Sequence, residues 1–193
     1  VLACVGAAVA LWPERVAEER GVAVAEDIRP GESRAVLLTD DGGEMVLEGG
    51  EAREIAVARG VRARKSGEGI AYPAAGADTA ETRYNTLRVP RGGEYKVVLS
   101  DGTVVYLNSA TRLRFPVAFG GRERVVALSG EAFFEVKSDS ARPFRVIADG
   151  ARIEVFGTSF NVNTRDEDAV RVALVEGSVG LRARGGKETR RMR

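Results

Sequence analysis

The chain has 193 residues, a formal net charge of +1, one cysteine and no histidine. Without histidine, this chain cannot build a Ser-His-Asp triad, a Cys-His dyad or a His-ligated metal site. One cysteine excludes an internal disulfide, and the near-zero net charge gives no long-range reason to expect a nucleic-acid or an anionic-membrane partner. A chain of this length can bury roughly 70% of the surface that its unfolded state exposes, so it needs no disulfide or metal staple.

The first stretch, Val1–Trp12, reads VLACVGAAVALW, carries no charge and ends at Pro13. As a helix it would span about 18 Å, less than the roughly 30 Å of a bilayer's hydrocarbon core. We interpret it as the end of a transmembrane helix with Trp12 at the interface. The alternatives are a secretion signal, with lipid attachment at Cys4 as a variant, and a buried core segment. Residues 13–27, of mixed charge, are predicted to be a membrane-proximal connector.

Short apolar runs rich in Val, Leu and Phe, separated by turn residues, fill residues 28–182. This pattern is typical of an all-β sandwich, barrel or solenoid. Asp101-Gly102 is the sharpest turn signal, because a two-residue type I′ hairpin needs positive φ at both central positions. It predicts that Tyr95–Leu99 and Val104–Leu107 are antiparallel partners.

The segment Pro30–Leu47 resembles Gly92–Leu107, since each reads as a turn, a strand, an Asp-Gly turn and a second strand. Repeated hairpin units stack because one unit cannot bury its own apolar face. We therefore predict stacked antiparallel hairpins in a small β-solenoid or sandwich-like domain; two ordinary hairpins in one sandwich explain the spacing equally well. Asp149-Gly150 is another tight turn, and Gly157 indicates a bulge or a close approach of two backbones.

Candidate reactive residues all have a simpler structural interpretation. Asp41 and Asp101 precede glycine in turns, Ser159 has no histidine to activate it, and Arg165–Asp168 is a charged turn whose carboxylates point in different directions. The sequence therefore assigns no catalytic, metal-binding or cofactor-binding residue, and it leaves the partner-binding residues unassigned.

Most aromatic side chains occupy alternating strand positions and are predicted to lie in the core. Phe133 is the exception, because the alternation places Ala132, Phe134 and Val136 on one face of a strand and Phe133 on the other. We expect Phe133 to cover a second layer or to lie in an interface.

Several blocks occur in a fixed order between Pro30 and Leu181: VPRGGEYKVVLSDGTVVYLNSATRLRFPVAF, LSGEAFFEV, PFRV, GTSFNV and LVEGSVGL. Together they resemble the FecR family of anti-sigma factors, especially its Bacteroidota branch. The resemblance implies a single-pass inner-membrane protein with this region in the periplasm. A cytoplasmic domain would hold an extracytoplasmic-function (ECF) sigma factor, and the N-terminal signalling domain of a TonB-dependent outer-membrane receptor would supply the signal. A regulatory membrane protease would then release the sigma factor.

The resemblance also implies a domain organisation. Residues 1–12 would be the periplasmic end of the membrane helix, 13–27 the connector, 28–182 the β domain, and 183–193 a linker to a C-terminal subdomain. No catalytic residue or cofactor is carried over, so a non-enzymatic signal-transducing module is expected. The alternative is a membrane- or lipid-anchored β-solenoid module that binds glycan or cell wall, which exposed aromatic residues in one row would favour.

Overall fold

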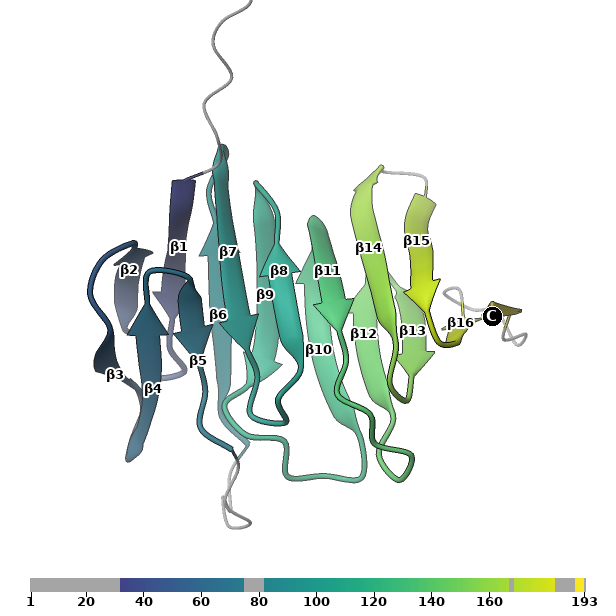
Figure 1. Cartoon of the computed structure of the whole chain (residues 1–193), viewed down its shortest axis with the longest axis horizontal. Helices are drawn as coiled ribbons and strands as arrows, with labels where there is room; N and C mark the ends of the chain where they lie inside the picture. Colours follow the sequence, from purple (N-terminus) through teal and green to yellow (C-terminus); the bar gives the residue numbers. More distant parts are fainter. Residues whose placement is uncertain (1–31, 75–81, 167–168, 183–189, 193) are drawn as a thin grey trace, which may run out of the picture.

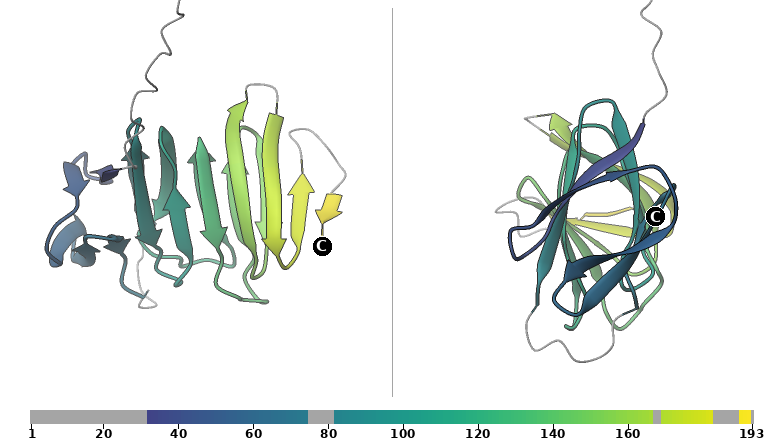
Figure 2. Two further views of the ribbon diagram at one scale, coloured as in Figure 1. Left: turned by 45° about the horizontal axis from the view of Figure 1, so that its top comes forward. Right: turned by 90° about the vertical axis from the view of Figure 1, so that its left-hand side faces the viewer.

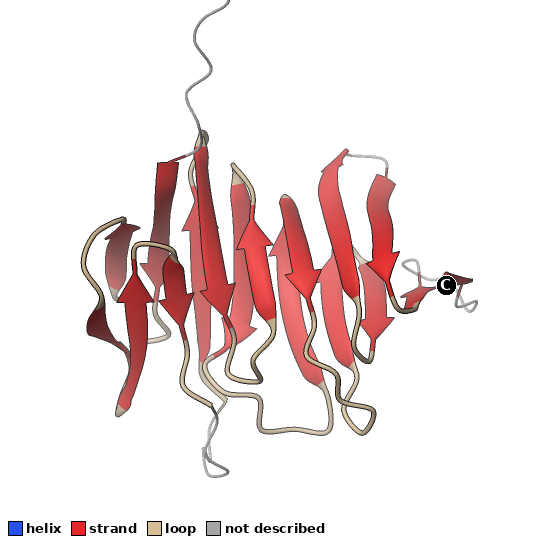
Figure 3. Ribbon diagram, viewed as in Figure 1, coloured by secondary structure: helices blue, strands red, loops and turns tan. Residues whose placement is uncertain are grey.

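The computed structural model describes residues 32–74, 82–166, 169–182 and 190–192. Strands and their connecting loops account for all of these residues, and none of them forms a helix (Figure 3). The prediction of an all-β fold is therefore confirmed. The predicted membrane-helix remnant at Val1–Trp12 and the predicted connector at residues 13–27 lie outside the described residues.

The strands form one continuous sheet of 17 strands that folds into two facing layers (Figure 1). The front layer contains, in spatial order, β3 (Arg53–Ala58), β4 (Val61–Ser66), β5 (Gly69–Ala71), β7 (Gly93–Val98), β8 (Val104–Leu107), β11 (Glu131–Glu135), β14 (Ser159–Asp166) and β15 (Ala169–Glu176). The back layer contains β2 (Glu44–Glu48), β1 (Glu32–Leu38), β6 (Tyr84–Val89), β9 (Thr111–Pro116), β10 (Arg124–Ser129), β12 (Phe144–Ala148), β13 (Ala151–Val155), β16 (Val179–Arg182) and β17 (Arg190–Met192). A short parallel contact between β1 and β7 joins the layers.

The chain passes from layer to layer as it advances along the long axis of the molecule. The β7–β8 hairpin lies in front, β9 and β10 lie behind it, β11 returns to the front, and the β12–β13 hairpin is again behind (Figure 1). Seen along the axis, the two layers enclose a flattened tube (Figure 2). The fold agrees with the predicted solenoid-like arrangement, because its hairpins stack in one direction. It also agrees with the predicted sandwich-like arrangement, because its two layers pack face to face.

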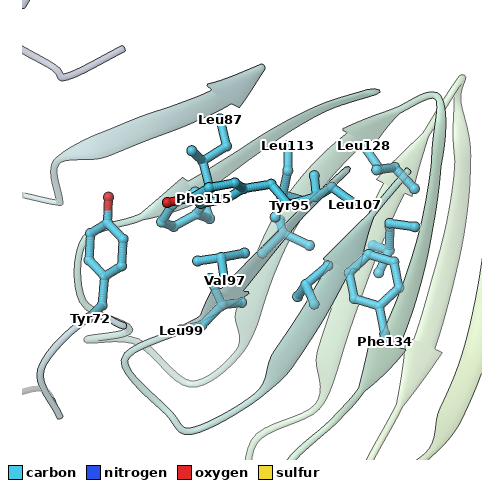
Figure 4. Packing of buried hydrophobic residues seen from close by; sticks show 14 of the residues in the cluster. Tyr72, Leu87, Tyr95, Val97, Leu99, Leu107, Leu113, Phe115, Leu128 and Phe134 are labelled. Carbon is cyan, nitrogen blue, oxygen red and sulfur yellow. The ribbon is translucent and has the colours of Figure 1, made fainter. Parts of the chain in front are cut away.

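Alternating apolar side chains fill the space between the layers. Tyr95, Leu107 and Phe134 reach inward from the front layer and meet Leu113 and Leu128 from the back layer (Figure 4). Each of these five side chains is at most 4% exposed. Because successive residues of a strand point to opposite faces, the same alternation leaves the polar residues of these strands on the outer surfaces.

The predicted antiparallel pairing around Asp101-Gly102 is confirmed, with Val97 opposite Val105 and Val98 opposite Val104. The predicted type I′ turn is wrong. Of the two central residues, Gly102 has a positive φ, +86°, and Asp101 does not. The Gly102 N–H donates to the Leu99 carbonyl at 2.9 Å. The turn is therefore a longer hairpin loop with glycine in the left-handed position.

At Asp149-Gly150 the rule for a two-residue turn does hold. Both residues have positive φ, +43° and +78°, and the flanking Ala148 and Ala151 are paired directly. The same dipeptide therefore closes loops of two different lengths, because the flanking strands decide how many residues the turn contains.

The two similar hairpins have equivalent turns but lie in different layers. In the first copy, the Gly42 N–H donates to the Thr39 carbonyl at 3.0 Å and the Thr39 N–H donates to the Gly43 carbonyl at 2.9 Å. In the second copy, the Leu99 N–H donates to the Thr103 carbonyl at 2.8 Å, which gives a loop of the same length. The first hairpin, β1–β2, belongs to the back layer, whereas β7–β8 belongs to the front.

The prediction for Gly157 is confirmed. Its φ is +156°, and a Cβ atom at this position would lie 2.8 Å from the Cα atom of Ser138. Within the stretch predicted as a linker, residues 190–192 form β17 against β16, and residues 183–189 and 193 lie outside the described part.

Candidate partner-binding groove

A groove of about 630 Å³ crosses the outer face of the front layer. Its floor comes from the central strands β7, β8, β11 and β14, and the turn between β4 and β5 forms a wall on one side. Figure 1 shows where these strands lie in the front layer. The inward-facing residues of these same four strands form the centre of the core. The groove therefore rests on the most constrained part of the domain.

One side chain from each floor strand lies in a single row across the groove. Lys96 is opposite Tyr106, Tyr106 is opposite Phe133, and Phe133 is opposite Asn161. The Tyr106 and Phe133 rings lie 6.2 Å apart between centroids and tilt by 38°, and the Lys96 ammonium lies 5.7 Å from the Tyr106 ring centre. Tyr106 is 41% exposed, so this aromatic pair offers accessible apolar surface between polar neighbours.

Glu131 organises the polar rim beside the aromatic pair. Its carboxylate accepts hydrogen bonds from the side-chain amides of Asn108 at 3.1 Å and Asn161 at 3.2 Å. The Arg165 guanidinium lies 3.2 Å from the same carboxylate. Three strand residues and Asn108, which directly follows β8, are thereby held in one network, which restricts the side chains around Phe133 before any partner arrives.

The wall of the groove depends on a close approach of β5 to β7. Gly69 has a φ of +152°, and a Cβ atom there would lie 2.2 Å from the Lys96 carbonyl oxygen. Only glycine lets the two strands pair in parallel at this point. The neighbouring Glu68 carboxylate lies 3.8 Å from the Lys96 ammonium, so the wall also helps to position a residue of the floor.

The groove has the chemistry of a binding site. Its best-placed carboxylate, Glu131, is already engaged by three donors, and the described part of the chain holds no cluster of three potential metal ligands. Amide, carboxylate and ammonium groups around an aromatic pair can fix the orientation of a partner, while the aromatic rings supply buried area. Phe133, predicted to cover a second layer or to lie in an interface, lies on this outer face.

The other residues considered in the sequence lie apart from the groove. Asp41 is in an exposed turn, where a hydrogen bond from the Thr39 hydroxyl lowers the pKa of its carboxyl group. Ser159 is opposite Glu176 at the start of β14. In the predicted charged turn, Asp166 forms an ion pair with Arg171 at 2.7 Å.

Asp101 does more than start a turn, and this role is not visible in the sequence. Its side chain accepts hydrogen bonds from the Thr103 N–H at 2.9 Å and the Thr103 hydroxyl at 2.7 Å. It also forms a 2.8 Å ion pair with Arg124, whose side chain is 1% exposed. The Arg124 guanidinium donates further to the carbonyls of Lys137 and Arg142. This buried network ties the β7–β8 turn to β10 and to the loop that precedes β12.

The structure defines a two-layered all-β domain with a groove on its front layer, and the comparisons with known proteins identify the family of the domain. Residues 85–180 match the family described as FecR protein, so this part of the chain is a FecR domain. Among curated proteins, none matches the chain. Most of the residues that line the groove fall within the matched range.

Two solved structures of a candidate anti-sigma factor from Parabacteroides distasonis are similar to this chain. One is 36% identical with a TM-score of 0.53, covering 56% of this chain and 51% of its own. The other is 37% identical with a TM-score of 0.52, covering 55% and 50%. The matched region therefore spans about half the length of these neighbours, and the likeness supports an anti-sigma-factor-like signalling role. No helix in the described part is long and apolar enough to cross a membrane.

Proposed function

We propose that this chain is the periplasmic signal-transducing part of a FecR-type anti-sigma factor anchored in the inner membrane. Its groove binds the N-terminal signalling domain of a TonB-dependent outer-membrane receptor. Binding changes the exposure of a membrane-proximal cleavage site to a regulatory membrane protease. An ECF sigma factor held by a cytoplasmic part of the protein is then released.

The observation that carries this proposal is the placement of the groove's central row inside the FecR-matched range. Its central row, Lys96 to Asn161, lies wholly within residues 85–180. The domain organisation at 1–12, 13–27, 28–182 and 183–193 is part of the same proposal, with residues 190–192 of the last segment paired with β16 of the β domain. The module acts by shape and contact and catalyses no reaction, because the groove offers recognition groups and no activated nucleophile.

The test is a binding titration of the chain against purified N-terminal signalling domains of TonB-dependent receptors from the same organism. Replacing Tyr106 and Phe133 with serine should weaken binding at least tenfold, because exposed aromatic anchors at the centre of an interface dominate affinity. The matched control is Phe156→Ser, since Phe156 is also a large exposed aromatic residue, 46% exposed, outside the groove. Unchanged binding in the double variant would remove the groove from the proposal.

A second candidate function is glycan or cell-wall binding, which the Tyr106–Phe133 pair favours because neighbouring exposed aromatic rings can stack on sugars. The same variants decide between the two. Loss of polysaccharide binding in the Tyr106→Ser, Phe133→Ser chain, with no receptor domain bound by the parent chain, would assign the groove to a glycan.

A further inference from the structure

The outer face of the back layer carries a set of arginines that we name the arginine face: Arg88, Arg112, Arg114, Arg152 and Arg182. The strand register places three of them in one row across the sheet. Arg114 is opposite Ala127, Ala127 is opposite Ile147, Ile147 is opposite Arg152, and Arg152 is opposite Arg182. Neighbouring strands lie about 4.8 Å apart, so Arg114 and Arg152 are separated by roughly 14 Å of regular sheet.

The arginine face contains two like-charge pairs that the fold does not require. Arg88 is directly opposite Arg112, and Arg152 is directly opposite Arg182. Like charges directly opposite one another destabilise an antiparallel pair, and the outer face of a layer would accept neutral residues here. In the first pair Glu44 already compensates Arg88, whereas an anion that bound between Arg152 and Arg182 would remove the repulsion in the second pair.

Four glutamates on this side of the domain are already paired. Glu44 contacts Arg88, Glu48 contacts Arg34, and Glu123 and Glu154 both contact Arg145. Arg112, Arg114, Arg152 and Arg182 have no carboxylate partner among the described residues. Arg114 instead stacks on the Tyr84 ring, with its guanidinium carbon 3.9 Å from the ring centre, an arrangement that holds the side chain along the surface.

We propose that the arginine face binds the anionic head groups of a phospholipid bilayer. Guanidinium groups match phosphate oxygens with two parallel hydrogen bonds, and one outer face of a sheet presents several of them on the same side. The short apolar side chains of Ala127 and Ile147 between the arginines suit such a surface. The proposal rests on the membrane anchoring included in the proposed function.

The sequence before the described part favours a bilayer over an acidic protein. Residues 13–31 separate the uncharged stretch Val1–Trp12 from β1, and even fully extended they reach at most about 65 Å. β1 belongs to the back layer and lies beside β6, which carries Arg88. An anchor at Val1–Trp12 would therefore keep the start of this layer within about 65 Å of the membrane.

The test measures partition of the whole chain onto vesicles of phosphatidylethanolamine with phosphatidylglycerol, and onto vesicles of phosphatidylcholine alone. The variant Arg112→Gln, Arg152→Gln removes one member of each like-charge pair. The matched control Arg62→Gln, Arg64→Gln removes the same charge from exposed positions of β4 in the front layer. Any contribution of Val1–Trp12 is common to all three chains and cancels.

At low salt, the Arg112→Gln, Arg152→Gln chain should bind anionic vesicles about 30-fold more weakly than the parent chain, and the control should stay within about twofold. High salt should abolish the difference. Equal loss in both variants, or no preference of the parent chain for anionic vesicles, would overturn the proposal. So would binding to polyglutamate without binding to anionic vesicles, which would assign the face to an acidic protein. The receptor titration contains no lipid, so the two proposals fail independently.

Discussion

Arg124 and Asp101 form the most deeply buried ion pair among the described residues, with side chains 1% and 5% exposed. Transfer of both charges out of water is costly, and hydrogen bonds with neighbouring groups offset this desolvation cost. Thr103 satisfies the Asp101 carboxylate, and two backbone carbonyls accept from the Arg124 guanidinium. The pair thereby links the β7–β8 turn to β10 and to the segments at Lys137 and Arg142.

Replacing Arg124 with methionine should lower the free energy of unfolding by about 3–5 kcal/mol, because Asp101 would remain buried without its counter-charge. Denaturant titration measures the change. The control is Arg62→Met, which breaks an exposed 3.5 Å pair with Glu54 and should cost less than about 1 kcal/mol. Similar losses in both variants would show that burial of the Arg124 pair is not the cause.

Two tyrosine hydroxyls lie in the core, and burial raises the pKa of both. The pKa of Tyr95 rises to about 12, and that of Tyr72 also rises because of burial, opposed in part by a hydrogen bond from Asn85. Since the unfolded tyrosine titrates near 10, the folded chain binds these protons more tightly. The resulting stability is complete below pH 10 and is lost as the pH rises toward 12.

The free energy of unfolding should therefore decline above pH 10, and Tyr95→Phe should make that decline shallower. At neutral pH the same substitution should cost little, because the Tyr95 hydroxyl has no hydrogen-bond partner among the described residues. Denaturation midpoints between pH 8 and pH 11 test both statements. Tyr106→Phe, at an exposed position, should keep the steeper decline. If the two variants gave identical curves of stability against pH, the decline could not be assigned to Tyr95.

At the scale of elements, the connections between layers matter as much as the strands. Gly130 lies where β10 in the back layer passes into β11 in the front layer. Its N–H donates to the Thr164 hydroxyl at 2.7 Å, and its carbonyl accepts from the Thr164 N–H at 2.8 Å. Its φ is +108°, and a Cβ atom there would lie 2.8 Å from the Cα of Thr111. The connection between the two layers at this point therefore depends on a residue that has no side chain.

Gly130→Ala should destabilise the domain by about 2 kcal/mol or more, because alanine disfavours this φ and its methyl group would displace the neighbouring strand. The melting temperature reports the loss. Gly49→Ala is the control, since a Cβ atom at Gly49 meets no atom within 4 Å and its effect should be small. An equal effect at the two positions would show that close packing at the crossing is not responsible.

The molecule as a whole separates its two outer surfaces by a single core. The front layer presents an aromatic pair inside a polar rim, and the back layer presents arginines in a regular row. Both sets of side chains stand on strands whose inward residues pack together, so each face is held rigid by the same apolar cluster. A partner bound to the front layer and a membrane at the back layer would therefore contact opposite sides of one packed core.

The sequence by itself determined the all-β class, the Asp-Gly hairpins and the outward position of Phe133, because period-2 alternation and turn chemistry are local properties. The tertiary structure alone decided which layer each hairpin occupies, how Asp101 meets Arg124, and how Lys96, Tyr106, Phe133 and Asn161 form one row. Those features depend on the register between strands that are distant in the chain. Turn dipeptides carry no information about that register, since packing across the whole core selects it.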